Sequence, residues 1–323
     1  MHSLLHAAFK LCATAVVGVI VVSGALAQTP ASKDASPGWY RMHVGTFEIT
    51  ALADGTLDLP VDQLFPKVDP GRIHALLARS YLAPNVSLTV NAFLVNTGTR
   101  LVLIDTGTGT SQMFGPKLGH LLANLRASGY SAEQVEEIYV THMHTDHIGG
   151  LMRDGQPAFP RATIRADVRE AGRYLSKAEM DAAPTDEKED YESAMSIFKP
   201  YLASGKFKPF DGETQLIPGV RAVPAAGHTP GHTIYVIESA GERMVAWGDL
   251  MHVAALQFPL PSATFETEWS TLKSAQQRQA VFADVASHGY YAAAAHVAFP
   301  GIGKLRTDGD GYTWVPVSYI FGK

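Results

Sequence analysis

The sequence predicts an α/β protein with two β-sheets covered by helices. Strand-like runs rich in β-branched residues gather as hairpins in each half of the chain, and stretches with apolar residues at helical spacing lie between them. A single doubly wound parallel sheet would instead alternate strand and helix along the whole chain. The length of 323 residues and the hydrophobic content of 46% are sufficient for a large core.

The first half of the chain contains the clearest hairpin signal. Two strand-like runs within 89–107 are split by Asn96-Thr97-Gly98, which is typical of a tight turn. A helix that ends before Gly129 is predicted by leucines at helical spacing: Leu118, Leu121, Leu122 and Leu125. The other elements expected in this half are strands over 135–142 and 162–167 and a helix over 166–180.

The second half continues with strands and two longer helices. An acidic segment over 179–192 is expected to be exposed and to lead into a helix over 192–205. The strands expected after it cover 220–226, 233–240, 243–249 and 290–299, and a helix over 268–288 separates the last two.

Residues 1–27 differ from the rest of the chain and predict a secretory signal peptide. Lys10 precedes an apolar run that ends in Ala25-Leu26-Ala27, a small-x-small cleavage pattern. The alternative is an uncleaved membrane anchor, because a run of about 17 residues is of borderline length for a bilayer. Cleavage would leave a polar leader over 28–38, one folded domain over 39–323, and a periplasmic or secreted protein outside the membrane.

The charge and the cysteine content narrow the kinds of partner and site. The formal net charge is −5 and no basic block occurs, so the sequence does not favour a nucleic-acid partner. The single cysteine, Cys12, lies inside the predicted signal peptide. The mature protein would therefore contain no thiol, and any metal site must use nitrogen and oxygen ligands.

A histidine cluster follows the strand expected over 135–142. His142 and His144 alternate at the strand end, so their side chains are expected on the same side, and Asp146 and His147 follow directly. Imidazole and carboxylate are ligands that Zn²⁺, Mn²⁺ and Fe accept where no thiolate is present. The cluster therefore predicts a metal site.

Three further candidate ligands each end an apolar strand. They are His228 after 220–226, Asp249 after 243–247 and His296 after 290–295. A single histidine or aspartate at a strand end is more often a hydrogen-bonded turn residue. Together, however, the three would supply the ligands that the local cluster lacks for a site with two metals.

At these residues the sequence resembles a known superfamily. "THMHTDHIGG" (141–150) is similar to the HxHxDH signature of the metallo-β-lactamase superfamily, and "GHTPGH" (227–232), the Gly-Asp pair at 248–249 and the late histidine resemble its other metal motifs. Longer stretches, including 37–56, 93–107 and 292–303, resemble methyl parathion hydrolase and related aryl-lactone hydrolases and arylesterases. This resemblance implies an αββα sandwich, a homodimer and a centre of two divalent metals, usually zinc, with Mn²⁺, Co²⁺ or Fe²⁺ as alternatives.

The resemblance also implies a role for each candidate ligand. One metal would be held by His142, His144 and His228, the other by Asp146, His147 and His296, with Asp249 bridging the pair. Asp105 would orient a ligand histidine, although an aspartate that caps a turn is an equally good interpretation. His232 is expected to support the site rather than bind metal.

The substrate pocket is predicted by comparison with the same family. The residues at pocket positions are Leu64, Phe114, Tyr174, Tyr191, His252 and Phe265. Phe114, Tyr174 and Tyr191 would form an aromatic entrance that stacks on an aryl leaving group, unless the two tyrosines only cover a helix surface. His252 either faces the substrate or holds a metal ligand.

The function implied is hydrolysis by a metal-bridging hydroxide, with Asp249 as the catalytic residue that orients the hydroxide and accepts its proton. Aryl lactones and aryl esters are the favoured substrates, with organophosphate triesters as side substrates. A dedicated organophosphate hydrolase is the main alternative. A metal-binding protein without turnover is a further one, but storage requires no bridging carboxylate. The chain has no G-x-S-x-G elbow of a serine hydrolase.

Overall fold

The computed structural model describes residues 36–111 and 113–319. The signal peptide predicted for residues 1–27 and most of the leader over 28–38 lie outside the described residues, so both stay predictions. Within the described part of the chain, no helix is both long and apolar enough to cross a bilayer.

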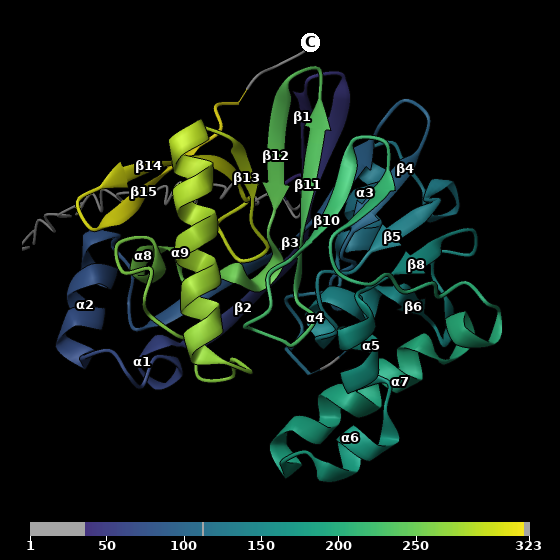
Figure 1. Ribbon diagram of the computed structural model, residues 1–323, viewed down its shortest axis with the longest axis horizontal. Coiled ribbons are helices and arrows are strands. Elements are labelled where there is room, and N and C mark those ends of the chain that lie inside the picture. Colours follow the sequence, from purple (N-terminus) through teal and green to yellow (C-terminus); the bar gives the residue numbers. More distant parts are fainter. Residues whose placement is uncertain (1–35, 112, 320–323) are drawn as a thin grey trace, which may run out of the picture. The chain divides into compact units, whose positions relative to one another are not determined.

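The first sheet has six strands and begins as an antiparallel meander (Figure 1). Its strands, in spatial order, are β1 (Trp39–Val44), β2 (Phe47–Pro60), β3 (Asn85–Asn96), β4 (Leu101–Ile104), β5 (Glu137–Tyr139) and β8 (Thr163–Arg165). β4, β5 and β8 are parallel to one another, so their carboxyl ends lie at one edge. A separate short hairpin is formed by β6 (Met152–Arg153) and β7 (Gln156–Pro157).

The second sheet has seven strands and contains one parallel pair. Its strands, in spatial order, are β15 (Gly311–Pro316), β14 (Ile302–Asp308), β13 (Tyr291–Ala293), β12 (Glu242–Ala246), β11 (Thr233–Ser239), β10 (Val220–Pro224) and β9 (Thr214–Ile217). β12 and β13 are the parallel pair, and the loops after them leave the sheet on the same side.

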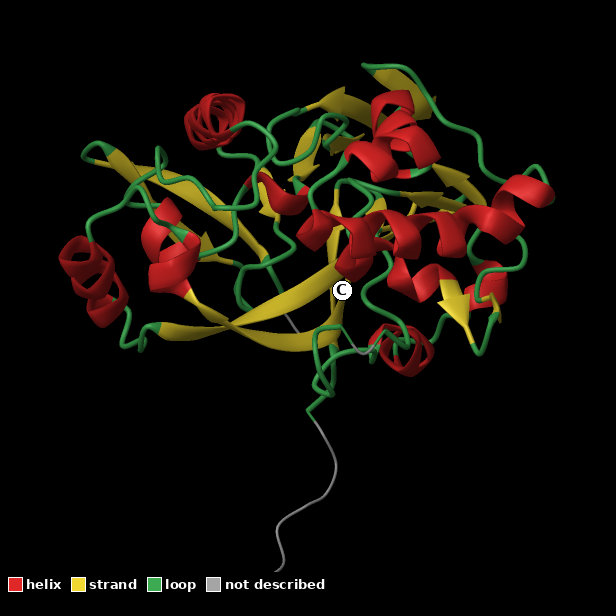
Figure 2. Ribbon diagram, turned by 90° about the horizontal axis from the view of Figure 1, so that it is seen from below, coloured by secondary structure: helices red, strands yellow, loops and turns green. Residues whose placement is uncertain are grey.

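Helices lie on both sides of the strands (Figure 2). They are α1 (Val61–Leu64), α2 (Pro70–Arg79), α3 (Leu121–Ala127), α4 (Thr145–Ile148), α5 (Val168–Tyr174), α6 (Lys177–Ala182), α7 (Lys188–Ala203), α8 (Ala254–Gln257) and α9 (Thr271–His288). Short 3₁₀ turns are η1 (Ala132–Gln134), η2 (Gly149–Leu151), η3 (Thr185–Glu187) and η4 (Gly248–Leu250).

Three apolar layers hold these elements together. The middle layer lies between the sheets, where Tyr139 of β5 stacks on Tyr235 of β11 with ring centroids 5.4 Å apart. An outer layer packs α3 and α7 on the first sheet, and another packs α9 on the second. The αββα arrangement that the family resemblance implied is therefore confirmed.

Two expectations about the elements were wrong. The acidic segment over 179–192 is mostly exposed, as expected, but it is largely helical: it contains the end of α6, all of η3 and the start of α7, which begins at Lys188 rather than near residue 192. Glu189 and Asp190 lie in its first turn, where carboxylates are stabilised by the helix dipole. The expected helix over 166–180 is divided into α5 and α6, and the second of these begins with a cap by Ser176, whose side chain accepts a hydrogen bond from the backbone N–H of Glu179.

Candidate metal centre

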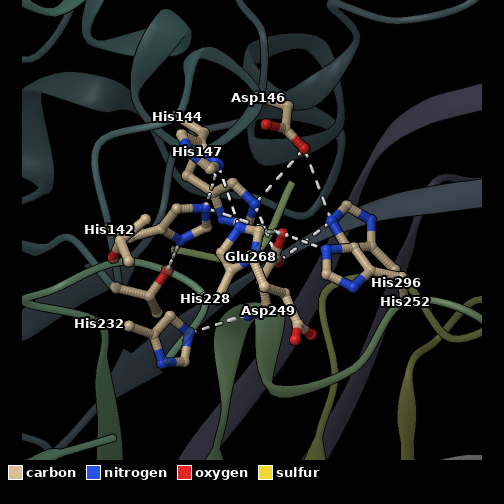
Figure 3. A network of polar contacts seen from close by, with 12 residues as sticks. His142, His144, Asp146, His147, His228, His232, Asp249, His252, Glu268 and His296 are labelled. Atoms are coloured by element: carbon tan, nitrogen blue, oxygen red, sulfur yellow. Dashed lines mark hydrogen bonds and ion pairs between the residues drawn. The ribbon is translucent and has the colours of Figure 1, made fainter. Parts of the chain in front are cut away.

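The candidate ligands meet where strand ends of both sheets come together. His142 follows β5, and α4 begins three residues later, so His144 precedes the first turn of α4 and His147 lies within it. The other three candidates lie in the segments after β10, β12 and β13 of the second sheet. The seven predicted ligand side chains thus point toward one another (Figure 3). They do so although they are up to 154 positions apart in the sequence, from 142 to 296.

The glycine pair after the cluster allows this close approach. A Cβ at Gly149 would lie 2.2 Å from the backbone oxygen of Thr108, and one at Gly150 would lie 1.9 Å from that of Thr106. Side chains at these positions would push α4 away from the loop that follows β4. The pair therefore fixes where α4 can place its ligands.

The first ligand group consists of three imidazole nitrogens. His144 Nδ1 lies 3.1 Å from His142 Nε2 and 3.0 Å from His228 Nε2. Zn²⁺ with bonds of about 2.0–2.1 Å in tetrahedral geometry places its ligand atoms roughly 3.3 Å apart. The first group therefore has the spacing of a metal site.

The second ligand group combines two carboxylates and two imidazoles. His147 Nε2 lies 3.4 Å from Asp146 Oδ2 and 3.1 Å from Asp249 Oδ1. His296 Nε2 lies 3.5 Å from the same Asp146 oxygen and 3.1 Å from the same Asp249 oxygen. These distances also bracket a tetrahedral edge of about 3.3 Å.

Asp249 is shared by the two groups through its two oxygens. Oδ1 faces His147 and His296, whereas Oδ2 lies 3.4 Å from His228 Nε2 and 3.7 Å from His142 Nε2. A carboxylate in this position can bind one metal with each oxygen. The geometry matches the bridging role that the family resemblance implied for Asp249.

Most ligand histidines are also held from the side that faces away from the centre. His147 Nδ1 donates to Asp105 Oδ2 at 2.8 Å, and His296 Nδ1 donates to the backbone oxygen of Thr89 at 2.9 Å. His142 Nδ1 lies 3.1 Å from the Thr141 hydroxyl and His144 Nε2 lies 2.9 Å from the Tyr174 hydroxyl. Such outer partners fix the ring orientation and the tautomer of metal-binding histidines.

Two of the inward-facing atoms make no hydrogen bond. They are His147 Nε2 and Asp249 Oδ1, which face each other at 3.1 Å and are buried, although burial of a polar atom without a hydrogen bond is costly. A cation bound between these atoms removes that cost. The donor set therefore fits two divalent metal ions.

Asp105 contacts the second group, as the family resemblance implied, and also shapes the adjoining loop. Its Oδ1 accepts the backbone N–H of Thr141 at 2.8 Å, and its Oδ2 accepts the Thr141 hydroxyl at 2.8 Å besides His147. The residue has φ +59°, a left-handed conformation that aspartate tolerates better than most residues. Asp105 therefore both turns the chain after β4 and orients His147.

His232 uses both ring nitrogens on the backbone. Nδ1 donates to the carbonyl of Ala225 at 3.1 Å, and Nε2 accepts the backbone N–H of Asp249 at 3.0 Å. Burial lowers the pKa of His232 to about 4, so the ring is neutral, as these two bonds require. His232 positions the loop of Asp249 and has no nitrogen left for a metal.

The two ligand groups differ in the direction in which the pKa of a central histidine is shifted. Burial, reinforced by His147, holds the pKa of His142 well below its usual range, so this imidazole is neutral. At His147 burial acts the same way, but Asp249, Asp146 and Asp105 outweigh it and hold the pKa well above its usual range. In the second group the proton on His147 thus balances the negative charge of the nearby carboxylates, and a bound divalent cation would supply positive charge in its place.

One wall of the centre is apolar and built around His252. The His252 ring stacks on Phe265 with centroids 4.1 Å apart, and Leu64 packs in the same apolar cluster as Phe265. On the open side of the centre, His144 and Asp146 are only partly buried. These two ligands therefore mark the side on which the centre reaches solvent.

His252 also contacts the bridging carboxylate. Its Nε2 lies 3.1 Å from Asp249 Oδ2, whereas its Nδ1 is buried without a hydrogen-bond partner. Together with His228 and Asp249 it forms a third set of atoms spaced for a metal. Two roles were predicted for His252. Its contact with Asp249 fits the role of holding a metal ligand. Its stacking on Phe265 places the same ring in the pocket wall.

The expected aromatic entrance is not present as predicted. Tyr191 belongs to α7 and is 1% exposed. Its ring centroid lies 5.1 Å from that of Tyr174, which is 4% exposed. Neither ring is free to stack on a leaving group, because both sit in the apolar layer of the first sheet. Tyr174 instead orients His144 through its hydroxyl. Phe114 is half-buried and packs near Val90 and Leu118.

Comparison with known proteins agrees with this geometry. The model of the metallo-β-lactamase superfamily matches residues 87–280. The chain belongs to this superfamily. The finer resemblance to methyl parathion hydrolase and the aryl-lactone hydrolases stays a prediction.

Two curated relatives match half of the chain or slightly more. A probable metallo-hydrolase of Mycobacterium tuberculosis is 28% identical over 207 residues, which cover 58% of this chain and 64% of that protein. An N-acyl homoserine lactonase of Bacillus cereus is 26% identical over 177 residues, which cover 50% of this chain and 62% of the lactonase. The matches thus span less than two thirds of either relative.

Solved structures are similar over almost their whole length. A hydrolase of the β-lactamase superfamily named AbOPH is 35% identical, with a TM-score of 0.84 and coverage of 89% of this chain and 100% of that chain. AidC, a dizinc quorum-quenching lactonase, is 26% identical, with a TM-score of 0.80 and coverage of 88% and 99%.

Several residues that hold this superfamily site were not predicted. Thr89 and Thr141 orient His296 and His142, and Glu170 of α5 accepts hydrogen bonds from two ligand-bearing loops. All three are of common residue types; Thr89 and Glu170 lie outside the quoted motifs, and Thr141 begins the stretch 141–150 without being a metal-binding residue type. The one available signal is that Glu170 lies on the buried face of its amphipathic helix, where a charged residue is unusual.

Proposed function

We propose that the protein is a binuclear metal-dependent hydrolase that opens aryl lactones and cleaves aryl esters, with zinc as the metal in both positions. The observation that carries this proposal is the position of Asp249, whose two oxygens face two separate groups of ligand atoms. A protein that only stores metal requires no such shared carboxylate.

Two divalent metals held by these residues would supply Lewis-acid chemistry, namely activation of water and polarisation of a carbonyl oxygen. The chain contributes the orientation of the ligands. Neutral His142 and His228 present lone pairs, and Asp105 directs Nε2 of His147 inward by accepting the proton on Nδ1. The proton-accepting role predicted for Asp249 stays a prediction.

The apolar wall supports a flat substrate. Phe265 and His252 stack on each other with an interplanar angle of 12° and are almost fully buried, so the partly buried Leu64 beside them offers the apolar surface on which an aryl ring can pack. The methoxy groups of a tetrahedral phosphotriester match this surface less well. We therefore expect organophosphate triesters to be poor side substrates.

N-acyl homoserine lactones are the second candidate substrates. Their support is the similarity to N-acyl homoserine lactonases and to the dizinc lactonase AidC. The chemistry of ring opening is the same for both lactone classes, and they differ in the group that packs on the wall. Export through the predicted signal peptide and assembly as a homodimer stay predictions.

A substrate panel on metal-loaded protein tests the proposal. Values of kcat/KM are measured for dihydrocoumarin, an aryl acetate, an acyl homoserine lactone, methyl parathion and a β-lactam. The proposal expects the aryl lactone to be the best substrate, with the rate lost in His147→Ala. A metal-loaded protein that hydrolyses none of the five would overturn it, and preference for methyl parathion would favour a dedicated organophosphate hydrolase.

A further inference from the structure

We propose that Glu170 is a positioning residue that sets the spacing of the first ligand group by joining the two loops that carry it. This inference rests on the metal centre of the proposed function. One loop runs from His142 to His144, and the other from His228 to His232. The two loops follow different sheets, so the first group is complete only when they are held at a fixed distance.

The carboxylate of Glu170 bonds to both loops at once. Oε1 accepts the backbone N–H of Met143 at 3.0 Å, and this residue lies between the two histidines of the first loop. Oε2 accepts the hydroxyl of Thr229 at 2.8 Å and the backbone N–H of Gly231 at 2.9 Å in the second loop. Glu170 itself is 1% exposed, so no water competes for these bonds.

The packing around Glu170 leaves no room for adjustment. A Cβ at Gly231 would lie 2.4 Å from the backbone nitrogen of Glu170 and 2.9 Å from its Oε2. A backbone hydrogen bond from Thr233 to Thr141, at 2.9 Å, also links the two segments, but it lies outside both ligand-bearing turns. Glu170 is thus the side chain that bridges the turns themselves.

The same helix also holds a ring of the first group. Tyr174 lies four residues after Glu170 on α5, so both side chains project from one face of the helix. Its hydroxyl lies 2.9 Å from His144 Nε2. α5 therefore controls two features of the first group: the separation of the loops through Glu170 and the orientation of His144 through Tyr174.

Glu170→Gln keeps the length and volume of the side chain but replaces one oxygen with an N–H donor. Whichever way the amide is turned, its NH₂ group faces a backbone N–H, of Met143 or of Gly231. One loop therefore loses its anchor. We call the metal sites formed by the first and second ligand groups the first and second positions. The metal affinity of the first position should fall roughly 10- to 100-fold, as for other groups that orient metal ligands, while the metal affinity of the second position should not change.

Asp167→Asn is the matched control because Asp167 is a buried carboxylate on the same helix. It caps α5 by accepting the backbone N–H of Arg169 at 2.8 Å, and it accepts that of Gly212 at 3.1 Å, but it bonds to neither ligand-bearing loop. Its loss should lower the thermal stability without changing the affinity of either metal position.

The experiment isolates each position in the full chain. His296→Ala disrupts the second position and His228→Ala the first, and metal-free protein is titrated with Co²⁺ by visible absorption and then with Zn²⁺ in competition. Glu170→Gln should weaken binding in the His296→Ala background only, and Asp167→Asn in neither. Thr229→Val, which removes one of the three bonds, should weaken the first position by a smaller factor of roughly 2 to 10 and serves if Glu170→Gln does not fold.

The outcomes separate this inference from the proposed function. Unchanged first-position affinity in Glu170→Gln or in a folded Thr229→Val variant would overturn the role of Glu170. Equal weakening of both positions would also overturn it, because that result describes general loss of stability. A wild-type protein that binds two metals but hydrolyses none of the panel substrates would remove the proposed function and leave the role of Glu170 intact.

Discussion

Asp105→Asn should selectively weaken the second metal position. In the wild type the Asp105 carboxylate accepts three hydrogen bonds: one from Nδ1 of His147, and two from the hydroxyl and the backbone N–H of Thr141. An asparagine amide has a single acceptor oxygen. In either orientation its NH₂ group meets an N–H donor, and the negative charge that holds the Nδ1–H tautomer of His147 is lost.

The size of the effect follows from the burial of this contact. Asp105 is 3% exposed and His147 is 1% exposed, so water does not replace the lost bond. A hydrogen bond to a charged group contributes about 1.5–3 kcal/mol. If this energy supports only the metal-binding orientation of His147, it corresponds to a roughly 10- to 150-fold loss of affinity.

The assay is the titration of metal-free protein with Co²⁺ and Zn²⁺ in the His228→Ala background, where only the second position remains. Asp105→Asn should lower the affinity by that factor, and Asp167→Asn should leave it unchanged. In the His296→Ala background Asp105→Asn should have a smaller effect, because it reaches the first group only through Thr141, and Asp167→Asn should have none. The reasoning is refuted if Asp105→Asn weakens the first position as much as the second, or if it weakens neither.

Three further predictions concern specificity, pH and export. His252→Leu removes the polar group beside Phe265, so the ratio of phosphotriester to aryl-lactone kcat/KM should rise roughly tenfold. An unchanged ratio together with loss of metal would mean that His252 only holds Asp249 in place and does not affect specificity. Burial opposes this shift, but nearby carboxylates raise the pKa of His147 well above its usual range and also raise that of His296, so His147 holds its second proton at neutral pH in the metal-free protein. Zn²⁺ uptake should therefore release protons, and affinity should fall as the pH is lowered; calorimetry in buffers of different ionisation enthalpy detects the release, and a pH-independent affinity would contradict it. Exported protein should begin at Gln28, and an intact mass that includes residues 1–27 would favour the anchored form.

The ligands were predictable because short stretches of the sequence contain them in recognisable patterns. Four of them lie within six residues after an apolar strand, and the remaining three each end a strand, so the edge of a sheet brings them together. The αββα layers followed from the superfamily resemblance, while the residue pattern alone indicated two sheets covered by helices. These features depend on short-range patterns that survive in a single sequence.

The residues that hold the ligands were not predictable for the opposite reason. Thr89 reaches His296 across 207 positions, and Glu170 reaches Gly231 across 61. Such contacts exist only after the sheets have packed, and threonine and glutamate occur throughout the chain. The predicted role of Tyr191 failed on the same ground, since a tyrosine on an amphipathic helix fits a core and an entrance equally well until the packing is known.

The most direct test of the shared carboxylate is the metal content of Asp249→Ala. Wild-type protein loaded with Zn²⁺ and freed of excess should contain two metals per chain by elemental analysis, and chelation should abolish hydrolysis until metal is returned. Asp249→Ala should lose metal from both positions, because Oδ1 and Oδ2 face different groups, whereas His296→Ala should chiefly empty the second. One metal per chain in both variants, or wild-type activity that survives exhaustive chelation, would contradict the binuclear centre.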